Sequence, residues 1–129
     1  MMKIMIVDND STYRGLLCEV LQMHGYAVTS ACDGEDALSQ MKQSAVDFIL
    51  CDISMPNMNG IIFHRRVRQD PFLKHLPFAW NSGYRELRNA VELQDPRIDL
   101  NLDKSTPLPD LLSLLGHFSA QRDNISNEH

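Results

Sequence analysis

The sequence predicts an α/β fold, a (βα)5 doubly wound three-layer sandwich in which one parallel sheet has helices on both faces. Three observations lead to this prediction. Short apolar segments alternate along the chain with segments whose apolar residues recur at helical spacing. The connections between these segments are short, which favours parallel strands with helices on both faces of the sheet. The length of 129 residues is typical of a single domain.

Each element is predicted from its own run of residues. The expected strands are short apolar or alternating runs, and they cover residues 3–7, 26–30, 46–51, 77–81 and 97–102. The expected helices have apolar residues on one side, and they cover residues 11–24, 33–43, 60–69, 84–94 and 107–118.

In chain order, the first strand is continuously apolar, as in a strand buried on both faces. The first helix has leucines and a valine on one side, and Gly25 ends it. The second strand alternates, and the second helix is short. The third strand is the most apolar run in the chain, so we expect it at the centre of the sheet.

The second half begins with a loop at 52–59 that contains Pro56 and Asn-rich turn chemistry. The third helix must end before Pro71, because the residue preceding a proline avoids the α conformation. The fourth strand, fourth helix and fifth strand continue the alternation. The last helix has a leucine stripe that ends at Phe118. We therefore expect a domain over 1–120 and a frayed polar C-terminal tail over 121–129.

Composition excludes several classes of protein. The net charge of −5 and the lack of any Lys/Arg run argue against direct binding to nucleic acid. Three cysteines without C-x-x-C spacing indicate reduced thiols in a cytoplasmic protein, and neither a disulfide scaffold nor a zinc site. The sequence has no apolar stretch long enough for a signal peptide or a membrane span.

Polar side chains follow four of the predicted strands. Because the carboxyl ends of parallel strands meet at one edge of the sheet, this edge is the expected ligand site. The residues that the sequence brings to this edge are Asp8, Asn9, Asp10, Asp52, Ser82, Asp103 and Lys104.

These residue types predict phosphoryl chemistry. The oxygens of Asp8, Asn9 and Asp52 are hard ligands that suit Mg²⁺ or Mn²⁺. Ser82 as a hydrogen-bond donor and Lys104 as a positive charge suit phosphoryl oxygens. A carboxylate beside a divalent metal and a phosphate clamp can form an aspartyl phosphate.

The segment FILCDISMPNMNG, residues 48–60, resembles very closely the phosphoacceptor segment of response regulator receiver domains in two-component signal transduction. The resemblance extends over about residues 3–118, with the acids, Ser82 and Lys104 at the corresponding strand ends. It implies a CheY-like, flavodoxin-like fold with strand order 2-1-3-4-5.

The resemblance also implies roles for single residues. Asp52 would accept a phosphoryl group from a sensor histidine kinase or a histidine phosphotransfer protein. Asp8, Asn9, Asp52 and the backbone carbonyl of Ser54 would hold Mg²⁺ (or Mn²⁺).

The remaining implied roles concern the phosphoryl group and the output. Ser82 would be the switch residue, and Lys104 would neutralise the charge of the phosphoryl group. Ser54 and Tyr84 match the positions that tune the lifetime of the acyl phosphate. A downstream protein or domain would bind the face made by the fourth helix, fifth strand and fifth helix, and homodimerisation is left open. The domain would be a signalling module with at most self-catalysed phosphorylation and dephosphorylation, and no enzyme.

The sequence departs from the family pattern at a few positions. Asn9 replaces the second acid of the usual metal pair, so we expect weaker Mg²⁺ binding. Asn101 replaces a coupling aromatic residue, so we expect a weakened or rebuilt connection from the switch hydroxyl to the output face. Further departures are Trp80, Asn81 and Ser105.

Several alternatives stay open at this point. A degenerate pseudo-receiver, acting as a phosphorylation-independent interaction module, fits the departures. An aspartate-dependent phosphohydrolase would need a second acid where Ser54 stands. Among single residues, Asp10 could cap the first helix, Ser82 could be a plain turn residue, and Lys104 could be a surface lysine paired with Asp103.

Overall fold

The computed structural model describes residues 1–127 and confirms the predicted fold. All strand pairs are parallel, and the five-stranded sheet has the order β2-β1-β3-β4-β5. The strands are β1 Lys3–Val7, β2 Ala27–Ala31, β3 Phe48–Cys51, β4 Phe78–Ser82 and β5 Asp99–Asp103. The helices are α1 Ser11–Met23, α2 Gly34–Gln43, α3 Gly60–Gln69, α4 Arg85–Ala90 and α5 Leu108–Asn127.

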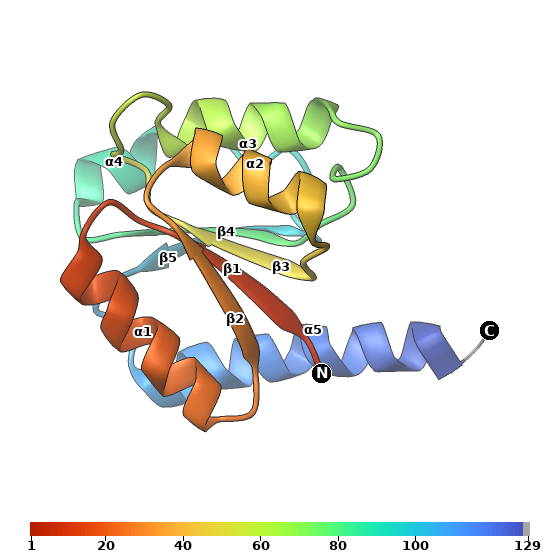
Figure 1. Ribbon diagram of the computed structural model, residues 1–129. Coiled ribbons are helices and arrows are strands. Elements are labelled where there is room, and N and C mark those ends of the chain that lie inside the picture. Colours follow the sequence, from red (N-terminus) through yellow and green to blue (C-terminus); the bar gives the residue numbers. More distant parts are fainter. Residues whose placement is uncertain (128–129) are drawn as a thin grey trace.

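The sheet separates two apolar cores. In Figure 1 the helices α2, α3 and α4 lie on one side of the sheet, and α1 and α5 lie on the other. Alternate side chains of each strand point to opposite faces, so Phe78 and Trp80 of β4 join the first core while Ala79 joins the second. The central strand β3 is buried throughout, as its continuous apolar run predicts.

The fourth helix is shorter than predicted. The sequence predicts a helix over 84–94, but α4 ends at Ala90. The following segment is held by the buried carboxylate of Asp99, whose Oδ2 accepts from the N–H groups of Gln94 and Asp95 at 2.8 and 2.9 Å. These bonds take the backbone groups that a longer helix would use.

The last helix is longer than predicted. It was expected to end near 118 with frayed residues after it, but α5 continues to Asn127. Phe118 is buried against Phe48, and the Arg122 guanidinium pairs with Asp47 at 3.1 Å. These contacts extend the helix along the core, past the edge of the sheet (Figure 1). The part of the predicted tail at 128–129 lies outside the described residues.

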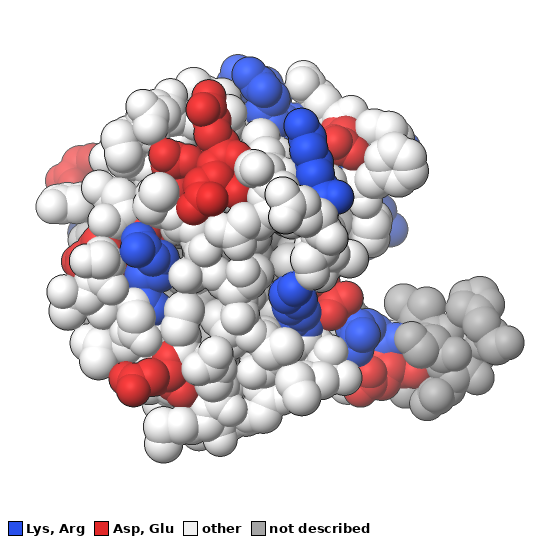
Figure 2. All heavy atoms as spheres, viewed as in Figure 1, with Lys and Arg blue, Asp and Glu red and all other residues white. Residues whose placement is uncertain are grey.

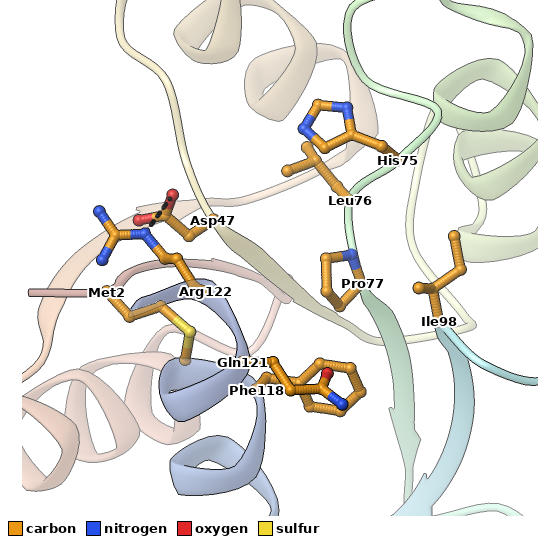
Figure 3. Close-up of a pocket in the computed structure, with 9 residues that line it drawn as sticks. All are labelled: Met2, Asp47, His75, Leu76, Pro77, Ile98, Phe118, Gln121 and Arg122. Atoms are coloured by element: carbon orange, nitrogen blue, oxygen red, sulfur yellow. Dashed lines mark ion pairs between the residues drawn. The ribbon is translucent and has the colours of Figure 1, made fainter. Parts of the chain in front are cut away.

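A cavity of 310 Å³ lies beside this part of α5, at the end of the sheet where the strands begin (Figure 3). Met2, Pro77 and Ile98 line it immediately before the starts of β1, β4 and β5, and Phe118 and Arg122 close it from α5. The cavity therefore lies at the opposite edge of the sheet from Asp8, Asp52 and Lys104, which follow the strands.

The surface carries charges of both signs. On the face shown in Figure 2, lysine and arginine side chains form separate patches between acidic ones. Among the helices of the described residues, none has the length and apolarity that crossing a bilayer requires.

Candidate functional site

The structure brings Asp8, Asp52 and Lys104 together at the carboxyl edge of the sheet. Asp8 follows β1, Asp52 follows the neighbouring β3, and Lys104 follows β5. The Lys104 Nζ lies 2.8 Å from Asp8 Oδ2 and 3.4 Å from Asp52 Oδ2. Asp8 and Asp52 are only 2% and 8% exposed, so their charges are compensated mainly inside this cluster.

Asp52 has one oxygen held by the backbone and one directed at the cluster. Its Oδ1 accepts from the N–H of Ile53 at 2.8 Å, which leaves Oδ2 toward Lys104. Gly60 lies against the backbone of Asp52, where an added Cβ would be 2.2 Å from the Asp52 carbonyl oxygen. The N–H of Gly60 donates to the Ile53 carbonyl at 2.7 Å. Residues 55–60 form an M-P-x-M-x-G motif, and the glycine at its end is therefore a steric requirement of this loop.

The surroundings of Asp52 disfavour its charged form, even with Lys104 beside it. Burial raises the pKa of the Asp52 carboxyl, and the charge of Asp8 raises it further, while Lys104 acts in the opposite direction. Burial alone would lower the pKa of the Lys104 ammonium, but its bonds to Asp8 and the charge of Asp52 raise it overall. An additional cation beside the two carboxylates would favour the charged form.

The other residues predicted for metal binding lie at the rim. Asn9 and Ser54 are both exposed, in the loops that follow β1 and β3. Asp8 Oδ1 accepts from the N–H of Asp10 at 2.9 Å, which fixes that carboxylate in the loop. Within residues 1–127, no three or more His, Cys, Asp or Glu side chains gather as a metal-ligand group. The two buried carboxylates of Asp8 and Asp52 are a donor set that fits Mg²⁺, because this ion uses one or two carboxylates and retains waters.

Ser82 lies at the same edge but its hydroxyl faces its own turn. It is fully buried at the end of β4, and its Oγ accepts from the N–H of Tyr84 at 3.1 Å. Tyr84 itself is 67% exposed at the start of α4. The position fits both the switch role and the plain turn that the sequence left open.

Asn101 makes a polar contact at the position where the family pattern has an aromatic side chain. Its Nδ2 donates to the carbonyl of Arg88 in α4 at 2.7 Å. The guanidinium of Arg88 donates to the Ser82 carbonyl at 3.0 Å and pairs with Asp103 at 3.1 Å. Arg88, which sequence reasoning missed, thus connects the end of β4 to α4 and β5.

Two single-residue alternatives are now decided. Asp10 is the N-cap of α1, since its Oδ1 accepts from the N–H groups of Thr12 and Tyr13, each at 3.1 Å. The surface pairing of Lys104 with Asp103 is wrong, because Asp103 contacts Arg88 and Ser105 instead.

Sequence reasoning also missed Tyr13. Its ring centroid lies 4.6 Å from the Lys104 Nζ, and its hydroxyl accepts from Asn81 Nδ2 at 2.7 Å. The available indication was the amide of Asn81 in a strand predicted to be buried, because a buried amide needs a hydrogen-bond partner.

The profile of the response regulator receiver domain matches residues 4–115, which include Asp8, Asp52, Ser82 and Lys104. The chain is a response regulator receiver domain. A receiver is a signalling domain of two-component systems rather than an enzyme.

Known proteins agree with this assignment. The chemotaxis protein CheY-3 of Vibrio cholerae is 43% identical over 92 residues, which cover 70% of this receiver and 71% of that protein. The response regulator TrrA of Thermotoga maritima, solved in complex with Mg²⁺-BeF, is 27% identical with a TM-score of 0.79 and covers 92% of this receiver and 99% of that chain.

Larger signalling proteins contain a similar segment. The sensor histidine kinase RcsC of Salmonella typhimurium is 41% identical over 68 residues, which are 53% of this receiver and 7% of that protein. The receiver thus spans only a small part of this relative.

Proposed function

We propose that this receiver accepts a phosphoryl group on Asp52 from a histidine kinase or a histidine phosphotransfer protein and signals through protein contacts. The observation that supports this most is the cluster at the carboxyl edge, where the ammonium of Lys104 contacts both Asp8 and the buried Asp52. A nucleophilic carboxylate next to a positive charge is what phosphoryl transfer to aspartate requires.

The Oδ2 atom of Asp52 is the proposed nucleophile, because Oδ1 is held by the N–H of Ile53. The phosphorus–nitrogen bond of a phosphohistidine donor breaks as the bond from phosphorus to Oδ2 forms, and the imidazole nitrogen leaves with the electron pair. Lys104, 3.4 Å from Oδ2, is positioned to neutralise the phosphoryl oxygens as negative charge gathers there.

Asp8, Asp52 and the carbonyl of Ser54 would hold Mg²⁺, with the amide of Asn9 as a further oxygen ligand. The bound ion would supply positive charge to the phosphoryl oxygens. The raised pKa of Asp52, caused by burial and by Asp8, supports a cation here. The Mg²⁺-BeF complex of the similar protein TrrA supports the same cofactor.

The residues around the nucleophile are proposed to control the phosphorylated state. Ser82 would turn its hydroxyl from the N–H of Tyr84 to the phosphoryl group. Ser54 and Tyr84 are both exposed beside the site and would tune the lifetime of the acyl phosphate by controlling the access of water.

The face made by α4, β5 and α5 is the proposed contact for a downstream protein. Asn101 and Arg88 join β5, α4 and the carbonyl of Ser82 by hydrogen bonds. A movement of Ser82 on phosphorylation would therefore displace this face through the hydrogen bonds of Arg88 and Asn101. These bonds would replace the aromatic side chain that the family pattern has at position 101.

The proposal is tested by incubating the protein with Mg²⁺ and acetyl phosphate and measuring its intact mass. We expect the mass of one phosphoryl group to be added to the wild type and not to Asp52→Asn. Asp10→Asn is the matched control, because asparagine also caps helices and the variant should still be labelled. A wild type that stays unlabelled with both acetyl phosphate and a phosphohistidine donor would refute the proposal and favour a phosphorylation-independent interaction module.

A further inference from the structure

Asn81 places an amide inside the core of the sheet. It is 6% exposed in β4 and points to the same face as Ala79, toward the core that α1 and α5 cover. Its Nδ2 donates to the hydroxyl of Tyr13 at 2.7 Å. A buried amide without a partner would be costly, so this bond fixes the two side chains relative to each other.

Tyr13 is held at both ends. Its backbone N–H donates to the Asp10 cap of α1 at 3.1 Å, and its hydroxyl accepts from Asn81 of β4. The aromatic ring between these anchors therefore has a defined position in the first turn of α1.

The ammonium of Lys104 contacts this ring. Its Nζ is 4.6 Å from the ring centroid, within the range of a cation–π interaction, while it also contacts Asp8 and Asp52. A lysine side chain has a flexible four-carbon stem and binds as a point charge with little directional preference. Contacts to the two carboxylates alone would let the ammonium move toward Asp8, which it already approaches more closely than Asp52.

We propose that Tyr13 is a positioning residue for Lys104, and that Asn81 holds the Tyr13 ring in place for this purpose. The ring keeps the ammonium within reach of Asp52 and of the phosphoryl group formed there. The contact of the ring with Lys104 stands on geometry alone, whereas its effect on phosphorylation rests on the proposed function. Asn81, which departs from the family pattern, and Tyr13 thereby share one role.

The first test measures the contact directly by NMR in the unphosphorylated protein. The ring current of Tyr13 should shift the Cε methylene protons of Lys104 upfield in the wild type and in Tyr13→Phe. The shift should disappear in Tyr13→Leu, which retains an apolar side chain without a ring. Equal Lys104 resonances in the wild type and Tyr13→Leu would overturn the contact, whatever the outcome for phosphorylation.

The second test measures the rate of labelling by acetyl phosphate. Tyr13→Leu should lower the rate by roughly 2- to 30-fold, the range that follows from typical cation–π strengths. Tyr13→Phe keeps the ring but loses the hydroxyl that accepts from Asn81, so it should give a loss between those of the wild type and Tyr13→Leu. Asn81→Ala, which leaves Tyr13 in place but frees its hydroxyl, should give an intermediate loss and serves if Tyr13→Leu does not fold.

A double-mutant cycle separates positioning from a general structural role. In a Lys104→Met background the substitution Tyr13→Leu should cause no further loss of rate, because the group that it positions is absent. The same loss in both backgrounds, or no loss in the presence of Lys104, would overturn the inference. Labelling of the wild type in the same series shows separately that the proposed function holds.

Discussion

Replacing Asp99 by asparagine tests how the receiver holds the end of α4 and the start of β5. The Asp99 side chain is fully buried, and its Oδ2 accepts from two backbone N–H groups, those of Gln94 and Asp95. Its Oδ1 accepts from His64 Nε2 at 2.8 Å and from the Arg68 guanidinium. Burial would raise the pKa of Asp99, but these donors lower it overall, so the carboxylate is the form that the fold favours.

The size of the destabilisation follows from the number of hydrogen bonds that the Asp99 carboxylate accepts. An asparagine has one acceptor oxygen, so its NH₂ group must face either the two N–H groups or the side chains of His64 and Arg68. At least two hydrogen bonds to a charged acceptor are then lost, at about 1.5–3 kcal/mol each. We expect Asp99→Asn to lower the free energy of unfolding by about 3–6 kcal/mol, which is a large part of the 5–15 kcal/mol typical of a domain.

Urea unfolding followed by circular dichroism measures this change. The midpoint should fall by more than roughly 1 M urea, given the usual dependence on denaturant for a domain of this size. Asp95→Asn is the control, because Asp95 pairs with Arg97 at the surface and should leave the midpoint nearly unchanged. A loss below about 1 kcal/mol for Asp99→Asn would mean that its hydrogen bonds do not stabilise this region as argued.

The remaining predictions concern pH, metal and the loop below the nucleophile. Burial lowers the pKa of His64, although Asp99 acts in the opposite direction, so the unfolded chain binds a proton more readily than the fold. Stability should therefore fall as pH drops below about 6.5, and His64→Phe should remove this dependence in urea unfolding. Asn9→Asp should tighten Mg²⁺ binding by about tenfold, through added negative charge, in a titration of the single tryptophan's fluorescence; unchanged affinity would contradict a role for position 9. Gly60→Ala should destabilise the fold by about 1–3 kcal/mol and slow labelling of Asp52, because its Cβ would meet the Asp52 carbonyl. Gly83→Ala, at an open position, should do neither; equal effects of the two substitutions would refute the steric argument.

The order of strands and helices could be predicted because each strand is one uninterrupted apolar or alternating run. The ends of α4 and α5 could not, because contacts with residues outside each helix determine them. Asp99 takes the backbone groups that would have continued α4, and the pairing of Arg122 with Asp47 joins α5 to a distant loop. Periodicity within a segment carries no information about either contact.

The main residues of the site could be predicted because parallel strands deliver their following residues to one edge. This placed Asp8, Asp52 and Lys104 together before any contact was known. Tyr13 and Arg88 could not be predicted, since they act from helix surfaces where a tyrosine or an arginine is ordinary. Their contacts depend on which side of α1 and of α4 faces the carboxyl edge of the sheet. The packing of these helices on the sheet determines this orientation.

The most direct test of the account is to locate the phosphoryl group after transfer from a phosphohistidine donor with Mg²⁺. Reduction with borohydride converts an aspartyl phosphate to homoserine, which peptide mass spectrometry can assign to one position. The account predicts homoserine at position 52, in the peptide that contains the M-P-x-M-x-G motif, and none in the Asp52→Asn variant. Homoserine at another aspartate, or at none after transfer, would contradict it.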